Sequence, residues 1–214
     1  MEDIARSYRQ FCALARALDV VGERWTLLLL RELLLGPRRF RDLLDGLPGI
    51  GPNLLSARLR RLQADELVVQ ERLEPPAASR VYVLTERGRA LDDALVALAR
   101  WGMDPIAPPR PDDRFDPGWY ALALRAAFRP ERARGVAEDY ELRVDGRTLH
   151  LRVSDGRAEA HQGPAPEPAM VLTAGTERLL SLLTARARPS AGELEGDPAA
   201  FERMLAAFEL PAPR

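Results

Sequence analysis

The sequence predicts an α+β protein built from two domains, and three observations lead to this prediction. Helical segments and a pair of strands succeed one another over residues 1–103, a stretch at 103–117 is rich in proline, and residues 140–163 alternate polar and apolar side chains around two Asp-Gly pairs. With 214 residues, 46% of them hydrophobic and 29% charged, the chain is long enough for one large domain or two small ones.

The boundary between the domains is predicted from the segment MDPIAPPRPDDRFDP at 103–117. It carries five prolines and four aspartates, and neither a helix interior nor a central strand tolerates that composition. The segments on either side have periodic patterns of their own. We therefore predict a first domain over residues 1–103, a stiff linker over 104–116 and a second domain over 117–214.

Helical periodicity dominates the first domain. Seven leucines stand among residues 27–35, and a Gly-Pro pair ends that helix. Phe40, Leu43 and Leu44 have the i, i+3, i+4 spacing of a short helix, and Thr85 followed by an acid is typical of a helix N-cap. The predicted elements are helices over 4–18, 20–35, 38–45 and 51–62, strands over 67–73 and 80–85, and a long helix from Thr85 to about Trp101.

This order is that of a winged helix-turn-helix, in which the helix at 51–62 would read DNA. Gly51 and Pro52 suit the N-cap and the first helical position. Leu55, Leu59 and Leu62 fall on one side of the helix and are expected to face the core. The opposite side combines small residues with an amide and guanidinium groups, which permits close approach to base edges. Its members are Asn53, Ala57, Arg60 and Ala64, with Ser56 and Arg61 at the edges.

Positive charge gathers around this helix although the whole chain has a net charge of −1. Residues 37–61 hold six arginines against two aspartates. Arg58 lies beside the apolar stripe, so we expect it either in a buried ion pair or at a phosphate. An ordinary solvated surface is the alternative interpretation, but arginines at the start of the preceding helix and beside the hairpin loop favour DNA. The predicted DNA-binding residues are Arg38, Arg39, Asn53, Ser56, Ala57, Arg58, Arg60, Arg61, Arg72 and Arg80.

Several motifs of the first domain stand at characteristic spacings. They are Cys12; Gly22, Trp25 and Thr26; Gly36, Arg39 and Phe40; and Pro76, Tyr82, Leu84, Thr85 and Gly88. In these residues the chain resembles, over about 10–102, the HxlR family of MarR-like winged-helix transcriptional regulators. Gly51 departs from the family, which more often has Ser or a similar cap there. The resemblance implies a homodimer that pairs through the first and last helices of the domain. Independently, residues 94–101 contain one charge only, so something must cover their second face.

Cys12 is the only cysteine of the chain, which excludes an intramolecular disulfide and fits a reducing compartment. On an apolar helix beside Phe11, Ala13 and Leu14, a cysteine is most often a small buried side chain. Some relatives in the HxlR family use the equivalent cysteine as a thiol sensor, so the resemblance makes Cys12 a redox candidate. Both interpretations stay open at this point.

The second domain is predicted to be an α+β meander with helices packed on one face. An apolar helix is expected over 117–128, and the Asp-Gly pairs in VDGR and SDGR predict two hairpins within 140–163. The remaining predicted elements are a strand over 169–174, a helix over 175–184, a short strand over 191–197 and a closing helix over 198–210.

The runs LTAGTERLLSLL and GELEGDPAAFERMLAAF resemble the sterol carrier protein family, over about residues 115–211. That family has a hydrophobic tunnel, so the resemblance implies an apolar small molecule or lipid as a ligand. The alternative is that the same side chains only pack the core. The candidate ligand-binding residues are Trp119, Leu122, Leu179, Leu183, Met204, Leu205 and Phe208.

The sequence contains no recognisable catalytic or cofactor-binding motif: no phosphate-binding Gly-Lys loop, zinc-protease helix, paired cysteines or nucleophile elbow. His150 and His161 stand without an evident third metal ligand. A charged start and interrupted apolar runs predict neither a signal peptide nor a membrane span. We therefore expect a cytoplasmic protein that is not an enzyme, with no cofactor, metal or membrane partner.

These observations predict a homodimeric transcriptional regulator that binds a double-stranded DNA operator, and whose second domain binds an apolar ligand or serves in dimerisation. The rival hypothesis is a carrier of lipid or another apolar ligand, or an interaction protein, in which the winged helix is only a dimer scaffold. The arginine-bearing helix face argues against the rival, because a scaffold does not need such a face.

Overall fold

The computed structural model describes residues 7–74, 78–103, 116–184 and 187–209. The chain divides into two compact units, Met1–Leu95 and Val96–Arg214. The predicted linker, 104–116, lies outside the described residues except for Asp116, and so does Pro76 of the wing motif. The Asp116 carboxylate accepts a hydrogen bond from the backbone N–H of Gly118 and thereby caps the helix that follows.

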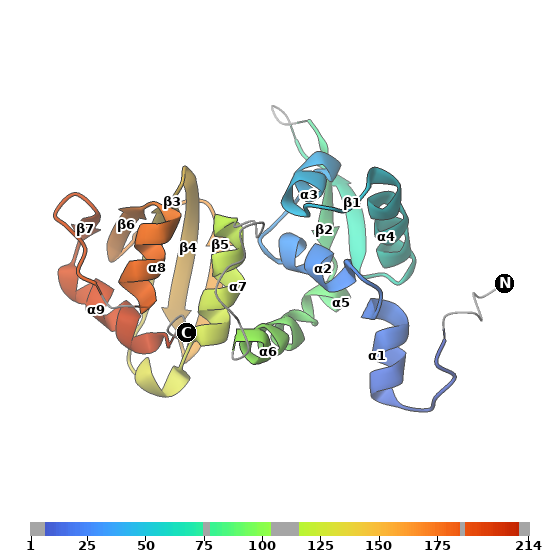
Figure 1. Ribbon diagram of the computed structural model, residues 1–214, viewed down its shortest axis with the longest axis horizontal. Coiled ribbons are helices and arrows are strands. Elements are labelled where there is room, and N and C mark those ends of the chain that lie inside the picture. The colour runs from blue at the N-terminus through green and yellow to red at the C-terminus, as the bar shows by residue number, and fades with distance from the viewer. Residues whose placement is uncertain (1–6, 75–77, 104–115, 185–186, 210–214) are drawn as a thin grey trace. The chain divides into compact units, whose positions relative to one another are not determined.

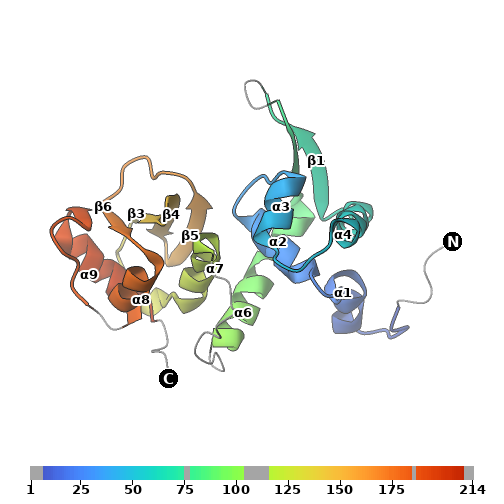
Figure 2. The same cartoon turned by 45° about the horizontal axis from the view of Figure 1, so that its top comes forward.

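The first unit is a winged helix-turn-helix (Figure 1), with the predicted order of helices and strands up to the end of the hairpin. In both views of the molecule the hairpin projects beyond α3 and α4 (Figures 1 and 2). The elements are α1 (Ala13–Val21), α2 (Thr26–Leu34), α3 (Phe40–Gly46), α4 (Pro52–Ala64), β1 (Val68–Arg72), β2 (Arg80–Leu84) and α5 (Glu86–Arg89), and α6 (Asp92–Met103) begins in this unit.

The predicted first helix over 4–18 is wrong in its bounds, because α1 starts only at Ala13. Residues 7–12 turn back along α1 instead. The Ser7 hydroxyl and the Tyr8 backbone N–H both donate to the Asp19 carboxylate, at 3.0 and 2.9 Å, and Arg9 has a φ of 53°. The amphipathic spacing did not reveal this side-chain hydrogen bonding, which competes with a helix.

The second predicted helix, over 20–35, is also wrong at its start, because α2 begins at Thr26. Trp25 precedes it with a φ of 78°, in the left-handed region. A residue in that conformation cannot continue a right-handed helix. The long helix predicted from Thr85 is likewise two helices, α5 and α6, although Thr85 is the N-cap that was predicted: its hydroxyl accepts from the Gly88 N–H at 3.0 Å.

The core of the first unit is made of aliphatic side chains from α2, α3, α4 and the hairpin. The strands β1 and β2 pair antiparallel from Val68 opposite Leu84 to Arg72 opposite Arg80. Arg38 adds a single bridge to this ribbon: its N–H donates to the Tyr82 carbonyl at 3.1 Å, and the Tyr82 N–H donates back at 2.7 Å. The start of α3 is therefore tied to the hairpin through the backbone.

The second unit is a sheet covered on one side by helices, as Figures 1 and 2 both show. Tyr140, Leu142 and Val144 are fully buried residues on the same face of one strand, because side chains alternate along a strand. The elements of this unit after α6 are α7 (Pro117–Ala127), the 3-10 turn η2 (Pro130–Arg132), β3 (Glu138–Val144), β4 (Arg147–Ser154), β5 (Arg157–Gln162), β6 (Met170–Ala174), α8 (Thr176–Thr184), β7 (Leu194–Gly196) and α9 (Pro198–Ala207).

The two predicted Asp-Gly hairpins are confirmed. Asp145-Gly146 joins β3 to β4 and Asp155-Gly156 joins β4 to β5, and all four residues have positive φ values, from 47° to 78°. Two consecutive positive values are what the two-residue turns of a right-twisted hairpin require.

The predicted meander is wrong beyond its third strand. The strand order is β5-β4-β3-β6-β7, and β6 runs parallel to β3 at its open edge. The connection over 163–169 crosses the sheet on the side away from α7, α8 and α9 (Figure 2). There the backbone N–H of Ala165 donates to the buried carboxylate of Glu141 at 2.9 Å. Strand periodicity marks a strand but does not reveal its partner, so this crossover was not predictable.

Candidate nucleic-acid interface

Helix α4 begins as the sequence predicts. Gly51 is the N-cap in an extended conformation, with φ −80° and ψ 151°, and Pro52 is the first helical residue. Leu55, Leu59 and Leu62 are at most 1% exposed. One side of the helix is therefore fixed in the core, and the opposite side is available to a partner.

The outer side of α4 carries exposed polar residues among small ones. Asn53, Arg60 and Arg61 are exposed, whereas Ser56 and Ala57 are half-buried. The Arg61 Nε donates to the Asp65 carboxylate at 2.9 Å, yet its side chain stays 43% exposed. This surface presents an amide and two guanidinium groups, which are the groups that hydrogen-bond to adenine, guanine and phosphate. We call Asn53, Ala57, Arg60 and Arg61 the reading face.

Arg58 is the one predicted DNA-binding residue of α4 that turns inward. Its guanidinium forms an ion pair with the Glu23 carboxylate, and its Nε donates to the Arg24 carbonyl at 3.3 Å. The Arg58 side chain is only 16% exposed. The sequence left Arg58 either in a buried ion pair or at a phosphate, and in the structure it forms the ion pair.

The arginines before α3 differ in exposure. Arg38 is half-buried, and its Nε donates to the Glu32 carbonyl at 3.3 Å. Arg39 is the exposed N-cap of α3, and its backbone N–H donates to the Asp42 carboxylate at 2.9 Å. Arg39 therefore has the freer guanidinium of the two.

The hairpin places two arginines side by side. Arg72 and Arg80 are direct cross-strand partners at the end of the ribbon, and both are exposed. Like charges directly opposite each other destabilise a strand pair. A polyanion next to the hairpin would relieve that repulsion, which is the arrangement expected of a wing that contacts phosphates.

The chain matches the HxlR-like helix-turn-helix family over residues 20–109, a range that includes α2 to α6 and the hairpin. An HTH-type transcriptional regulator of Synechocystis is 37% identical over 94 residues, which cover 44% of this chain and 69% of that protein. The chain belongs to the HxlR-like family. The arginines before α3, on α4 and on the hairpin thus lie within the part of the chain that matches the HxlR-like helix-turn-helix.

Two further relatives and one solved structure are similar to part of this chain. A regulator of Mycobacterium tuberculosis is 44% identical over 100 residues, and the match spans 47% of this chain but only 61% of that protein. The regulator YodB of Bacillus subtilis is 32% identical over 40% of this chain and 76% of its own length. The structure of reduced YodB has a TM-score of 0.40 at 28% identity, covering 47% of this chain and all of YodB.

These relatives are named transcriptional regulators, and such regulators are not enzymes, as the sequence predicts. Among the described residues, no helix has both the length and the apolar composition that a membrane crossing requires. The HxlR-like match ends at residue 109, so the sterol-carrier-like assignment of the second unit stays a prediction.

The predicted ligand-binding residues of the second unit are mostly core. Five of the seven, Leu179, Leu183, Met204, Leu205 and Phe208, are at most 7% exposed. Trp119 and Leu122 are half-buried. An open hollow of about 500 Å³ lies elsewhere, between β7, the start of α9 and residues 188–191. The alternative that these side chains pack the domain therefore has the support of their burial.

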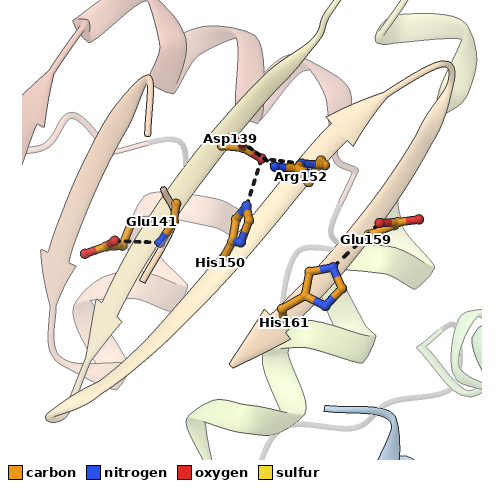
Figure 3. Close-up of polar contacts among 7 residues, drawn as sticks. Asp139, Glu141, His150, Arg152, Glu159 and His161 are labelled. Carbon is orange, nitrogen blue, oxygen red and sulfur yellow. Dashed lines mark hydrogen bonds and ion pairs between the residues drawn. The ribbon is translucent and has the colours of Figure 1, made fainter. Parts of the chain in front are cut away.

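The two histidines come together on the helix-free side of the sheet, as cross-strand partners on β4 and β5 with ring centroids 5.7 Å apart. Figure 3 shows Asp139 between His150 and Arg152. The His150 Nε2 lies 2.8 Å from the Asp139 carboxylate, which also accepts two hydrogen bonds from Arg152, at 2.8 and 3.0 Å. The Arg152 hydrogen bonds, with help from His150, lower the pKa of Asp139 to about 2. The described residues contain no group of three or more metal-ligating side chains.

Cys12 is exposed at the N-cap of α1, so the expectation of a buried side chain is wrong for this chain. It adjoins an uncovered apolar face: Phe11 is fully exposed, Leu14 is 68% exposed and Leu18 is 39% exposed. The spacing of apolar residues in the sequence predicted an apolar face on this helix. It did not reveal that the core of the first unit, among the described residues, leaves Leu14 and Leu18 exposed.

Two residues that contact α4 or the turn before it were not among the predicted site residues. Glu23 pairs with Arg58, and Trp25 precedes α2 in a left-handed conformation. Trp25 had a signal, because it belongs to the family motif. Glu23 had none, because nothing in the sequence links it to an arginine 35 positions away.

Proposed function

We propose that this chain is a sequence-specific transcriptional regulator that binds double-stranded DNA as a homodimer. The reading face of α4 enters the major groove, and the hairpin follows the adjacent backbone. The observation that carries the proposal is the division of α4 into a buried leucine side and an exposed side with Asn53, Arg60 and Arg61. The naming of the HxlR-like relatives as transcriptional regulators supports it.

The residues divide into two roles. Arg60 and Asn53 read base edges, because an exposed guanidinium or amide on a helix in the groove can make paired hydrogen bonds to guanine or adenine. Arg39, Arg72 and Arg80 contact phosphates, because they stand on the flanking elements. Arg38 and Arg58 are held by contacts within the chain and support the surface from behind.

The homodimer is proposed because two helices of the chain leave large apolar side chains uncovered. On and just before α1 these are Leu14, Leu18 and Phe11, and on α6 they are Leu98 at 50% and Trp101 at 76% exposure. A contact that buries such side chains is favourable by about 25 cal/mol per Å² of apolar surface. A second copy with the same faces supplies a self-complementary partner.

The test is selection of bound sequences from a random duplex pool by the full chain, followed by titration of the selected duplex against salt. We expect an inverted repeat with half-sites about 34 Å apart, as two equivalent helices on successive major grooves require. Weak binding that enriches no sequence and disappears with salt would overturn the proposal, because it would be non-specific attraction to phosphates.

An apolar ligand or lipid as a controlling partner of the second unit remains a separate prediction. Organic extraction of the purified chain, with mass spectrometry of the extract, tests it directly. Co-purified lipid together with no selective DNA binding would favour the carrier hypothesis.

A further inference from the structure

Helix α4 is held from one side by the short segment that joins α1 to α2. We call this segment, residues 22–25, the α1–α2 corner. It contacts α4 and the turn before it at two points, and both contacts lie within the first unit. These two contacts together help to fix the position of α4, and with it the reading face, relative to α1 and α2.

The first contact is polar. The Glu23 carboxylate pairs with the Arg58 guanidinium, and the Arg24 carbonyl accepts from the Arg58 Nε at 3.3 Å. The space left around the pair is about 10 Å³, at the lower limit of what a single water needs. Arg58, in the second turn of α4, is therefore held by an ion pair with Glu23 and by a hydrogen bond to the Arg24 backbone carbonyl.

The second contact is apolar. The outer ring atoms of Trp25 lie against Gly49 in the turn before α4, 3.6 and 3.8 Å from the place where a β-carbon would stand. Trp25 reaches this position with a φ of 78°, a conformation that is uncommon for a bulky residue and persists only where the surroundings hold it.

We infer that Glu23 is a positioning residue for DNA recognition: through Arg58 it fixes the rotation and height of α4, so that Asn53 and Arg60 meet base edges. The inference rests on the proposed function and adds to it a residue that itself contacts no DNA. A small displacement of a recognition helix lengthens several base contacts at once, whereas phosphate contacts made by flexible arginines adapt to it.

Because Glu23 is negatively charged, the inference can be tested by whether Glu23→Gln lowers or raises the affinity for DNA. A carboxylate near DNA repels phosphates, so electrostatics alone predicts that Glu23→Gln strengthens binding to every sequence. A positioning role predicts the opposite for the selected duplex, because the charged partner of Arg58 is lost. The two interpretations therefore differ in direction and not only in size.

The experiment compares Glu23→Gln with the wild-type chain on the selected duplex and on a random duplex of equal length. We expect affinity for the selected duplex to fall on the order of tenfold, while affinity for random DNA stays within about twofold. Equal or tighter binding of the selected duplex by Glu23→Gln would overturn the inference.

Asp45→Asn is the matched control. Asp45 is an exposed acid at the end of α3, paired at 3.9 Å with Arg41 of the same helix and not with α4. The Asp45→Asn variant loses the same charge as Glu23→Gln, so its affinity for both duplexes should equal that of the wild type or be slightly higher. Thermal unfolding of each variant distinguishes a loss of affinity from a loss of fold.

Arg58→Gln separates positioning from a direct phosphate contact. If Arg58 touches a phosphate, the slope of log affinity against log salt falls by about one. If Arg58 acts through Glu23, the slope is unchanged, and the double variant Glu23→Gln/Arg58→Gln loses no more affinity than the single variants. Additive losses with a reduced slope would overturn the inference.

Hydrogen exchange on the free protein gives a readout that needs no DNA. We expect faster exchange of the α4 backbone amides in Glu23→Gln than in the wild type and in Asp45→Asn. Unchanged exchange would overturn the inference even if the chain selected no DNA sequence. A wild-type chain that selects no sequence, with faster exchange in Glu23→Gln, would instead overturn the proposed function and leave the corner as a support of α4 only.

Discussion

Arg72 and Arg80 face each other as direct cross-strand partners at the outer end of the β1–β2 hairpin. Two positive charges in this register oppose each other when the protein is free. The pair therefore does not stabilise the hairpin of the free protein.

Replacing one of these arginines should separate stability from binding. We expect Arg80→Ala to leave the free energy of unfolding unchanged or to raise it by a few tenths of a kcal/mol, up to about 1 kcal/mol, as relief of the like-charge pair. The same variant should bind both selected and random DNA more weakly. Thermal unfolding and a salt titration of binding measure the two effects, and a destabilised variant would contradict this account of the hairpin.

Arg60→Ala should reduce specificity. We expect a loss of about 1–3 kcal/mol on the selected duplex, because one side chain that reads a base edge contributes that much discrimination. Binding to random DNA should change much less. Titrations of the two duplexes at the same salt concentration provide the measurement, and equal losses on both would contradict a base-reading role.

Arg39→Ala should weaken binding without changing specificity. Arg39 is exposed at the N-cap of α3, where backbone N–H groups already favour a phosphate. We expect the same loss on selected and random duplexes, and a salt slope smaller by about one. Arg38→Ala is the informative comparison, because its guanidinium is held by the Glu32 carbonyl and so should alter the slope less.

A charge on the uncovered face of α1 should prevent dimerisation. We expect Leu14→Glu to sediment as a monomer at concentrations where the wild type is a dimer, because a carboxylate in an apolar contact carries a large desolvation cost. Leu180→Glu is the control: Leu180 is an exposed leucine of α8 in the second unit, at 36% exposure. A dimer that survives Leu14→Glu would show that the contact lies elsewhere.

The carboxylate between His150 and Arg152 should make the chain sensitive to acid. The pKa of Asp139 is lowered to about 2 in the folded chain, below the ordinary value near 3.9. Its ionised form therefore stabilises the fold above about pH 4, and this contribution is lost as the pH falls from about 4 towards 2.

The Asp139→Asn variant should accordingly be less stable than the wild type at neutral pH and approach it at low pH. Midpoints of thermal unfolding, followed by circular dichroism between pH 2 and 7, test this pattern. Asp155→Asn makes the same charge change at an exposed turn and is the matched control. A pH-independent gap for Asp139→Asn would contradict the assigned role.

Much of the fold was predictable because it depends on local spacing. The leucine stripe of α4, its Gly-Pro start, the Thr85 cap and the two Asp-Gly hairpins all follow from residues within one or two turns of each other. The exposed residues of the reading face follow from the same periodicity, because fixing Leu55 and Leu59 inward places Arg60 outward.

The sequence by itself determined the order of helices and strands, the buried side of α4 and the arginines gathered around it. Only the tertiary structure decided that Arg58 turns towards Glu23, that Cys12 lies exposed and that β6 joins the sheet beside β3. The physical reason is the distance along the sequence between the interacting residues. Periodicity and capping depend on residues that are neighbours along the chain. An ion pair, a strand partner or an exposed apolar face depends on which distant segment of the chain packs next to it.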